Sequence, residues 1–258
     1  MLRAVVFDWG HTLLDFTSGQ EDLLACYEQV RVILEGQAYN NVPAATDLVH
    51  NLSKRVEAIV EESYRSQELE ELDLVELFDS TLRVLEYPLP ADLVRQIVEM
   101  EHRALTGKLA MTETNLEVLH TLKEWGLKLG IVSNITFLPE LFRADMDRFG
   151  IGAYVDEFVF SAAFGLRKPH PGIYRHMLEM LGASASEAIF VGDRIHDDVW
   201  GAQQIGMRGV LTQEFRREEP EPGGTQPDHV ISALPELLPY VKRMCDEPAS
   251  AKTASSRL

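Results

Sequence analysis

The feature that most restricts the fold of this chain is a series of short apolar runs, separated by helical stretches and often ending in polar residues. The runs occupy residues 4–7, 129–132, 158–160, 188–191, 210–211 and 230–231. The first run is apolar at every position, which is typical of a strand buried on both faces of a parallel sheet. Strands that alternate with helices indicate βαβ units. We therefore predict an α/β protein whose core is a Rossmann-like parallel sheet.

A second pattern, helical periodicity without any strand-like segment, covers residues 20–106. Apolar residues recur there every three or four positions, as Leu23, Tyr27 and Val30 illustrate. We interpret this segment as an all-helical cap domain inserted into the core. Residues 214–228, rich in charge, Pro and Gly, are predicted to form a surface loop. The predicted boundaries are 16–106 for the cap domain, 1–15 and 107–246 for the core domain, and 247–258 for a disordered tail.

Composition limits the classes of partner and compartment. The 258 residues include 41 acidic and 24 basic ones, for a formal net charge of −17, which disfavours nucleic acid and anionic membranes as partners. No run approaches the roughly 18 consecutive apolar residues of a membrane span, and no secretory signal is visible. We therefore expect a cytoplasmic protein, either a monomer or a homodimer. Cys26 and Cys245 match no metal or disulfide spacing, and Cys26 falls in an apolar helical stripe that predicts a buried thiol.

Three of the predicted strands end in side chains that are capable of chemistry. They are Asp8 after the first strand, Ser133 and Asn134 after the second, and Asp193 after the fourth. Ligands of open α/β sheets bind outside the carboxyl ends of the strands. We therefore expect these side chains to meet at one edge of the sheet and to form the functional site.

Four segments of the chain carry a recognisable pattern. They are VVFDWGHTL at 5–13, GIVSN at 130–134, GLRKPHP at 165–171 and FVGDRIHDDVWGA at 190–202. In residue type and order they resemble the motifs of the haloacid dehalogenase (HAD) superfamily, in the branch whose helical cap is inserted after the first strand. The resemblance implies Mg²⁺-dependent hydrolysis of a small phosphorylated metabolite through a covalent aspartyl-phosphate.

The resemblance assigns four residues to the transferring phosphoryl group. Asp8 is the implied nucleophile, Lys168 and Ser133 would grip the phosphoryl group, and Asn134 would contribute a further donor. An ammonium group and a cation neutralise the repulsion between an anionic nucleophile and a phosphate ester. Taken singly, Ser133 has the simpler interpretation of a cap on the next helix, and Lys168 that of an exposed loop lysine.

The resemblance also implies a metal site. The implied Mg²⁺ ligands are Asp8, the backbone carbonyl of Gly10, and Asp193, all of them hard oxygen donors that suit this ion. Asp198 would support the metal shell or hold Lys168. Without the resemblance, Asp193 and Asp198 are equally typical of a solvated helix start, which the helix dipole favours.

The chain departs from the family's phosphatases at Gly10, where they carry a second Asp that protonates the leaving oxygen and then activates water. Loss of such general acid–base help typically costs ~10²–10⁴-fold in rate. His11 stands where the family usually has Gly, and it can replace the acid only if a turn, rather than extended backbone, directs its ring toward the site. We predict that Trp9 and His11 bind the substrate, with Trp9 packing against the cap or roofing the pocket.

Two other functions remain as alternatives. Phosphonoacetaldehyde hydrolases have a small residue at the position of Gly10 and activate their substrate through a cap lysine, and the predicted cap contains one lysine, Lys54. A non-catalytic protein that binds a phosphorylated ligand would also tolerate Gly10. Haloacid dehalogenases lack an acidic residue at the position of Asp193, which argues against dehalogenation.

Overall fold

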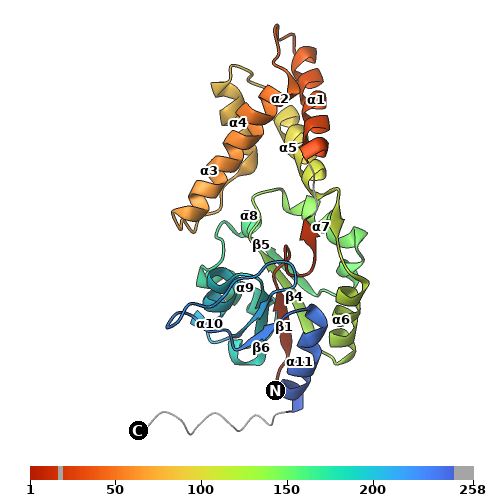
Figure 1. The fold of residues 1–258 in the computed structure, drawn as a ribbon, viewed down its shortest axis with the longest axis vertical. Helices are drawn as coiled ribbons and strands as arrows, with labels where there is room; N and C mark the ends of the chain where they lie inside the picture. The colour runs from red at the N-terminus through yellow and green to blue at the C-terminus, as the bar shows by residue number, and fades with distance from the viewer. Residues whose placement is uncertain (17–19, 247–258) are drawn as a thin grey trace.

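The computed structural model describes residues 1–16 and 20–246 and contains a six-stranded parallel sheet (Figure 1). In spatial order the strands are β5 (Glu157–Phe160), β4 (Lys128–Ser133), β1 (Ala4–Phe7), β6 (Ala188–Gly192), β7 (Arg208–Thr212) and β8 (His229–Ile231). Every neighbouring pair in this sheet is parallel. The predicted α/β class with a Rossmann-like core is therefore confirmed, whereas the predicted tail at 247–258 lies outside the described residues.

The central strand β1 is buried on both faces. Val5 and Phe7 belong to an apolar cluster with residues of α6 and α11, whereas Ala4 and Val6 belong to a second cluster with residues of α9. Successive side chains of a strand point to opposite faces, so an entirely apolar strand requires helices on both. Figure 1 shows α6 (Glu113–Glu124) and α11 (Leu237–Asp246) on one side of the sheet, and α9 (Pro171–Leu181) and α10 (Gly201–Gln204) on the other.

Five helices between residues 20 and 106 lie beyond the carboxyl edge of the sheet (Figure 1). They are α1 (Gln20–Gly36), α2 (Ala45–Leu48), α3 (Lys54–Arg65), α4 (Leu74–Val84) and α5 (Ala91–Thr106), with a π-helical turn at Val49–Ser53. Their apolar faces form a separate core around residues such as Tyr27, Leu52 and Phe78. The predicted helical character of this insert is confirmed, and its domain boundaries stay a prediction.

Two short strands that the sequence pattern does not predict lie where the chain passes between the sheet and the helical insert. β2 (Asp15–Phe16) pairs with β3 (Leu109–Ala110) in antiparallel orientation. The pairing joins the outgoing and returning connections of the insert. Each strand has only two residues, which is too short for an alternating pattern to appear in the sequence.

The remaining elements are short connections around the sheet. They are α7 (Pro139–Arg148), α8 (Ser161–Phe164), the 3₁₀ turns Ile151–Ala153, Ala185–Glu187 and Leu234–Glu236, and a π-helical turn at Ile195–Trp200. The predicted loop at 214–228 contains neither helix nor strand. In the described part of the chain, no helix has the length and apolar character needed to cross a membrane. Cys26 is buried as predicted, and burial raises the pKa of its thiol to about 12.

Candidate active site

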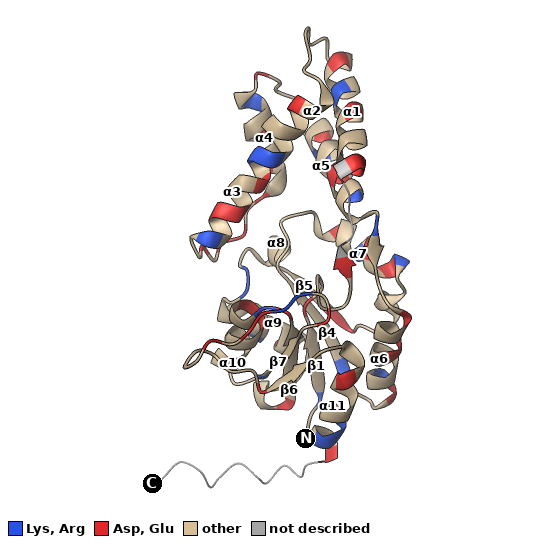
Figure 2. Cartoon of the chain, in the orientation of Figure 1, with Lys and Arg blue, Asp and Glu red and all other residues tan. Residues whose placement is uncertain are grey.

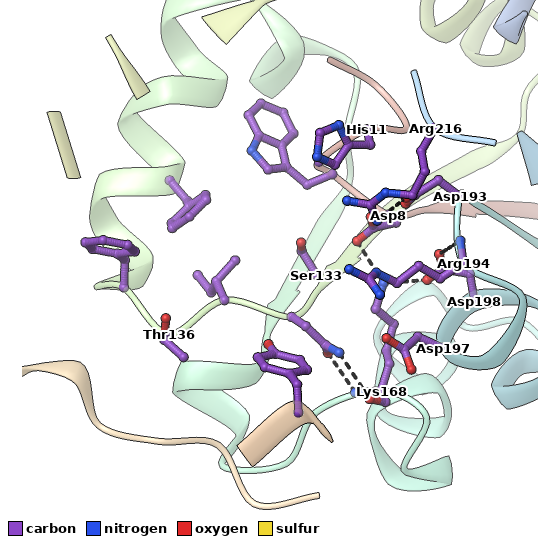
Figure 3. A pocket seen from close by; sticks show the side chains of 17 residues that line it. Asp8, His11, Ser133, Thr136, Lys168, Asp193, Arg194, Asp197, Asp198 and Arg216 are labelled. Carbon is purple, nitrogen blue, oxygen red and sulfur yellow. Dashed lines mark hydrogen bonds and ion pairs between the residues drawn. The ribbon is translucent and has the colours of Figure 1, made fainter. Parts of the chain in front are cut away.

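Three carboxylates converge at the carboxyl edge of the sheet (Figure 3). Asp8 directly follows β1 and Asp193 directly follows β6, and these strands are in register, with Phe7 opposite Val191. The backbone N–H of Asp8 donates to the carbonyl oxygen of Val191 at 2.9 Å, which extends the pairing of the two strands to Asp8. One oxygen from each of Asp8, Asp193 and Asp198 lies within 4.8 Å of the other two. The strand ends therefore meet as the sequence pattern indicates.

Lys168 bridges two of these carboxylates. Its Nζ donates to Asp8 Oδ1 and to Asp198 Oδ1, both at 2.7 Å, and its side chain is only 3% exposed. Burial opposes the charge, but the carboxylates of Asp198 and Asp8 hold the pKa of Lys168 above its ordinary value. The interpretation of Lys168 as an exposed loop lysine is therefore wrong, and the ammonium group is available beside Asp8.

Asp198 holds Lys168 and is itself held by the backbone. Its Oδ2 accepts from the N–H of Arg194 at 2.9 Å, and burial raises the pKa of its carboxyl group. A Cβ atom at Gly192 would lie 2.2 Å from Asp198 Cγ, so only glycine lets this carboxylate pack against the end of β6. The interpretation of Asp198 as part of a solvated helix start is wrong, because the residue is 1% exposed.

Asn134 and Ser133 differ in what their side chains contact. Asn134 Oδ1 accepts from the backbone N–H of Lys168 at 2.7 Å, and Asn134 Nδ2 donates to the Lys168 carbonyl oxygen at 3.1 Å. The amide group thus fixes the loop that carries Lys168. Ser133 is buried and lines the cavity beside Asp8, which we call the pocket. It does not cap the next helix, since the N-cap of α7 is Leu138.

Asp193 has partners on both carboxylate oxygens. Thr12 Oγ1 donates to Oδ1 at 3.4 Å, and Arg216 Nη1 donates to Oδ2 at 2.6 Å. Burial, followed by the charge of Asp8, raises the pKa of the Asp193 carboxyl group. Arg216 comes from the loop at 214–228 and was not predicted to belong to the site. Its only signal in the sequence is a basic pair, Arg216–Arg217, within a segment rich in acidic residues.

The residues after Asp8 form a tight turn that faces the pocket. His11 adopts a left-handed backbone conformation with φ of 56°, so the backbone turns at this residue and is not extended. The residue lines the cavity at Asp8. Its Nδ1 lies 3.1 Å from Asp15 Oδ1. Trp9 is 1% exposed and also lines the pocket, and its Nε1 is buried without a hydrogen-bond partner among the described residues. An acceptor oxygen on a bound ligand would satisfy this N–H.

The helical insert contributes to the same pocket through Tyr64 of α3. Arg167, the neighbour of Lys168, is buried between the two parts of the molecule, and its guanidinium group lies over the Tyr64 ring at 4.1 Å from the centroid. Arg167 Nη2 also donates to Ser63 Oγ at 3.1 Å and to the Glu70 carbonyl oxygen at 2.9 Å. Arg167 thereby connects the lysine loop to α3, a contact that the sequence motif does not predict.

The charge of the pocket leaves room for a cation. The cavity at Asp8 has a volume of about 290 Å³. Its lining carries four carboxylates, Asp8, Asp193, Asp197 and Asp198, against three cations, Lys168, Arg194 and Arg216. Of these cations, Lys168 and Arg216 lie at ion-pair distance from the carboxylates of the cluster. Elsewhere, acidic residues are spread over the helices of the core and of the insert (Figure 2). The carboxylates at the sheet edge differ from these because they are buried and lie close together. Closely spaced carboxylate oxygens are a donor set that fits a hard divalent ion.

Comparison with known protein families gives a match over most of the chain. A family model described as haloacid dehalogenase-like hydrolase matches residues 2–206. The matched range includes the sheet edge at Asp8 and Asp193 and the whole helical insert.

Three individual proteins extend the comparison. A glyceraldehyde 3-phosphate phosphatase of Methanopyrus kandleri is 28% identical over 250 residues, which cover 96% of this chain and 100% of the relative. Another protein of that name, from Methanocaldococcus jannaschii, is 31% identical over 143 residues, which cover 55% of this chain and 61% of the relative. The crystal structure of a 2-haloacid dehalogenase from Pseudomonas syringae pv. Tomato DC3000 has a TM-score of 0.68 at 22% identity, covering 95% of this chain and 100% of that one. At this identity, the structural likeness shows the fold.

Proposed function

The chain belongs to the haloacid dehalogenase-like hydrolase family, and on this premise we propose that it hydrolyses a small phosphorylated metabolite through an aspartyl-phosphate on Asp8. The observation that carries the proposal is the buried contact between Lys168 Nζ and the Asp8 carboxylate at 2.7 Å. It places a fixed positive charge beside the one carboxylate that ends the central strand. The relatives named as phosphatases support the same reaction class.

Each residue has a defined task in the proposed reaction. A carboxylate oxygen of Asp8 attacks phosphorus, a new P–O bond forms, and the bond from phosphorus to the leaving oxygen breaks. Lys168 and Ser133 stabilise the charge of the transferring phosphoryl group, and Asn134 and Asp198 hold Lys168 in position. The leaving oxygen takes a proton from solvent, since Gly10 has no acidic side chain. Water then attacks phosphorus and loses a proton to solvent, and the bond from phosphorus to Asp8 breaks, which releases phosphate and restores the carboxylate.

We propose Mg²⁺ as the cofactor. Asp8, the backbone carbonyl of Gly10, and Asp193 would hold it, with Asp198 fixing Lys168 beside them. When bound, Mg²⁺ neutralises negative charge around the phosphoryl group and orients it for attack. The buried position of the three carboxylates supports this assignment, since such a cluster is unfavourable without compensating positive charge.

The proposal is tested by release of phosphate from p-nitrophenyl phosphate and from a panel of phosphorylated metabolites. We expect turnover with Mg²⁺, loss of turnover on chelation with EDTA, and recovery when Mg²⁺ is restored. Ca²⁺, which prefers more ligands and longer distances, should restore much less activity. Turnover that is the same with and without chelator would contradict the assigned metal site.

Replacement of Arg216 by Gln should tighten binding of Mg²⁺. Arg216 forms an ion pair with Asp193, which is also a proposed ligand of Mg²⁺. Binding of Mg²⁺ must therefore displace or weaken the ion pair between Arg216 and Asp193. We expect the dissociation constant of Mg²⁺ to fall about two- to fivefold, the range that a partly exposed ion pair represents. Isothermal titration with MgCl₂ in the absence of substrate measures it. Arg217→Gln, an exposed neighbour, is the matched control and should leave the constant as it is.

The alternative of carbon–phosphorus cleavage has less support. Lys54 is exposed, and its Nζ pairs with Glu57 Oε2 at 2.5 Å. An imine-forming lysine must be neutral, whereas this ammonium group is exposed and held in an ion pair. The hydrolysis of phosphate esters therefore remains the function that the site supports best.

A further inference from the structure

A second and larger cavity adjoins the active-site pocket. Its volume is about 620 Å³, against about 290 Å³ for the cavity at Asp8. The two share Tyr64 of α3, Thr136 and Phe137 of the loop after β4, and Arg194. We call the larger cavity the cap chamber. Because the two cavities share these four lining residues, the cap chamber is the adjoining space for the organic part of an ester whose phosphoryl group lies at Asp8.

The walls of the cap chamber are apolar over most of their area. They come from four helices of the insert (α1, α3, α4 and α5), from its π-helical turn, and from the core loops after β4 and β6. The wall residues include Val56, Val60, Leu74, Phe78, Leu105 and Phe137. Val56, Leu74 and Phe78 are at most 5% exposed, so these walls are parts of the packed helical core. Burial of an apolar group against such walls is favourable, in proportion to the apolar area removed from water. These walls therefore favour an apolar organic group.

The lining also contains charged side chains, namely Lys54, Glu57, Glu61, Arg65 and Arg194, and one carboxylate that is buried, that of Glu101. Glu101 is 5% exposed and lines the chamber together with Ser53. Glu101 Oε1 accepts from Ser53 Oγ at 2.7 Å and Oε2 from Tyr27 Oη at 2.6 Å. A carboxylate accepts about four hydrogen bonds, so these two bonds leave acceptor capacity for a ligand in the chamber. The feature selects an organic group that carries a hydrogen-bond donor.

We propose that the cap chamber binds the organic group of the substrate, and that this group is an aromatic or branched apolar body with a hydroxyl or ammonium donor at the end away from the phosphate. The phosphoryl end lies at Asp8 and the donor end at Glu101. The inference rests on the proposed function, because it assigns a substrate class to the same site.

The proposed contact between Glu101 and a hydrogen-bond donor of the substrate is tested with two aryl phosphates of similar shape and similar leaving group. Tyramine O-phosphate carries an ammonium group where 4-propylphenyl phosphate carries a methyl group. We expect kcat/KM to be at least about tenfold higher for the tyramine ester, as a charge-assisted hydrogen bond implies. In Glu101→Gln this preference should fall to within about twofold. Equal kcat/KM values for the two esters in the native protein would overturn the proposed donor contact.

The apolar walls are tested separately, by filling the chamber from a partly exposed position. Val60→Trp should lower the ratio of kcat/KM for 4-propylphenyl phosphate to that for acetyl phosphate at least about tenfold. Ile59→Trp, next on the same helix but outside the lining, should leave this ratio unchanged. A ratio that is the same in Val60→Trp and the native protein would overturn the chamber assignment.

Acetyl phosphate also separates the two proposals from each other, because its acyl group is too small to need the chamber. If no Asp8-dependent turnover is found, either of any phosphate ester or of the acyl phosphate, the proposed function fails. If acetyl phosphate is turned over but neither variant changes the aryl preference, only the chamber assignment fails.

Discussion

Replacement of Asp8 by Asn is expected to abolish metal-dependent phosphate release, with a loss of roughly 10⁴-fold or more, as for removal of other covalent nucleophiles. The amide has almost the shape of the carboxylate but is a far weaker nucleophile. It also removes one of the two anionic partners of Lys168, at 2.7 Å. The measurement is phosphate release at saturating Mg²⁺ and substrate, together with the mass of acid-quenched protein. Native protein should show a phosphorylated species that the variant lacks.

The matched control for this substitution is Asp47→Asn, an exposed residue of α2 that is outside the pocket. It should retain native turnover and native unfolding temperature. Asp8→Asn should also stay folded, because relief of repulsion within the carboxylate cluster offsets part of the lost ion pair. Turnover that is indifferent to Asp8→Asn would reject the proposed nucleophile.

Replacement of Gly10 by Asp is expected to raise the turnover of unactivated alkyl phosphates, within the ~10²–10⁴-fold range that general acid–base catalysis contributes. The new carboxyl group would protonate the leaving oxygen and then activate water. Gly10 is not among the described glycines with positive φ, so the backbone there does not require glycine. The gain should be much smaller for p-nitrophenyl phosphate, whose leaving group needs no proton.

Gly10→Asn is the control for this prediction, because it has the same size but cannot transfer a proton. It should leave the turnover of alkyl phosphates near the native level. If Gly10→Asp and Gly10→Asn behave alike, the account of Gly10 as a missing acid is wrong, and His11, which lines the same pocket, becomes the first residue to replace.

The convergence of Asp8 and Asp193 could be predicted because it depends on local features. An apolar run that ends in an aspartate predicts a buried strand with a carboxylate at its carboxyl end. In a parallel sheet, these ends share one edge. The burial of Lys168 between two carboxylates followed only from the motif resemblance, since a lysine in a loop has no pattern of its own.

Other contacts were missing from the sequence interpretation for identifiable reasons. Arg216 reaches Asp193 across 23 residues from an irregular loop, whose path no periodicity describes. Asn134 was predicted as a donor to the phosphoryl group, whereas its amide contacts the Lys168 backbone 34 residues away. The role of Asn134 toward a substrate stays a prediction. The position of Arg167 over the Tyr64 ring depends on how the insert packs on the sheet.

The amino-acid order alone establishes the parallel sheet, the helical insert and the acidic residues at the strand ends, because these follow from side-chain polarity at fixed local spacing. It cannot establish the cap chamber, whose walls come from four helices and two core loops far apart in the chain. The size of that cavity and the exposure of Glu101 to it depend on the packing of the insert against the sheet. Packing between distant segments depends on the whole set of tertiary contacts. The proposed substrate class therefore rests on the tertiary structure and could not be inferred from the sequence.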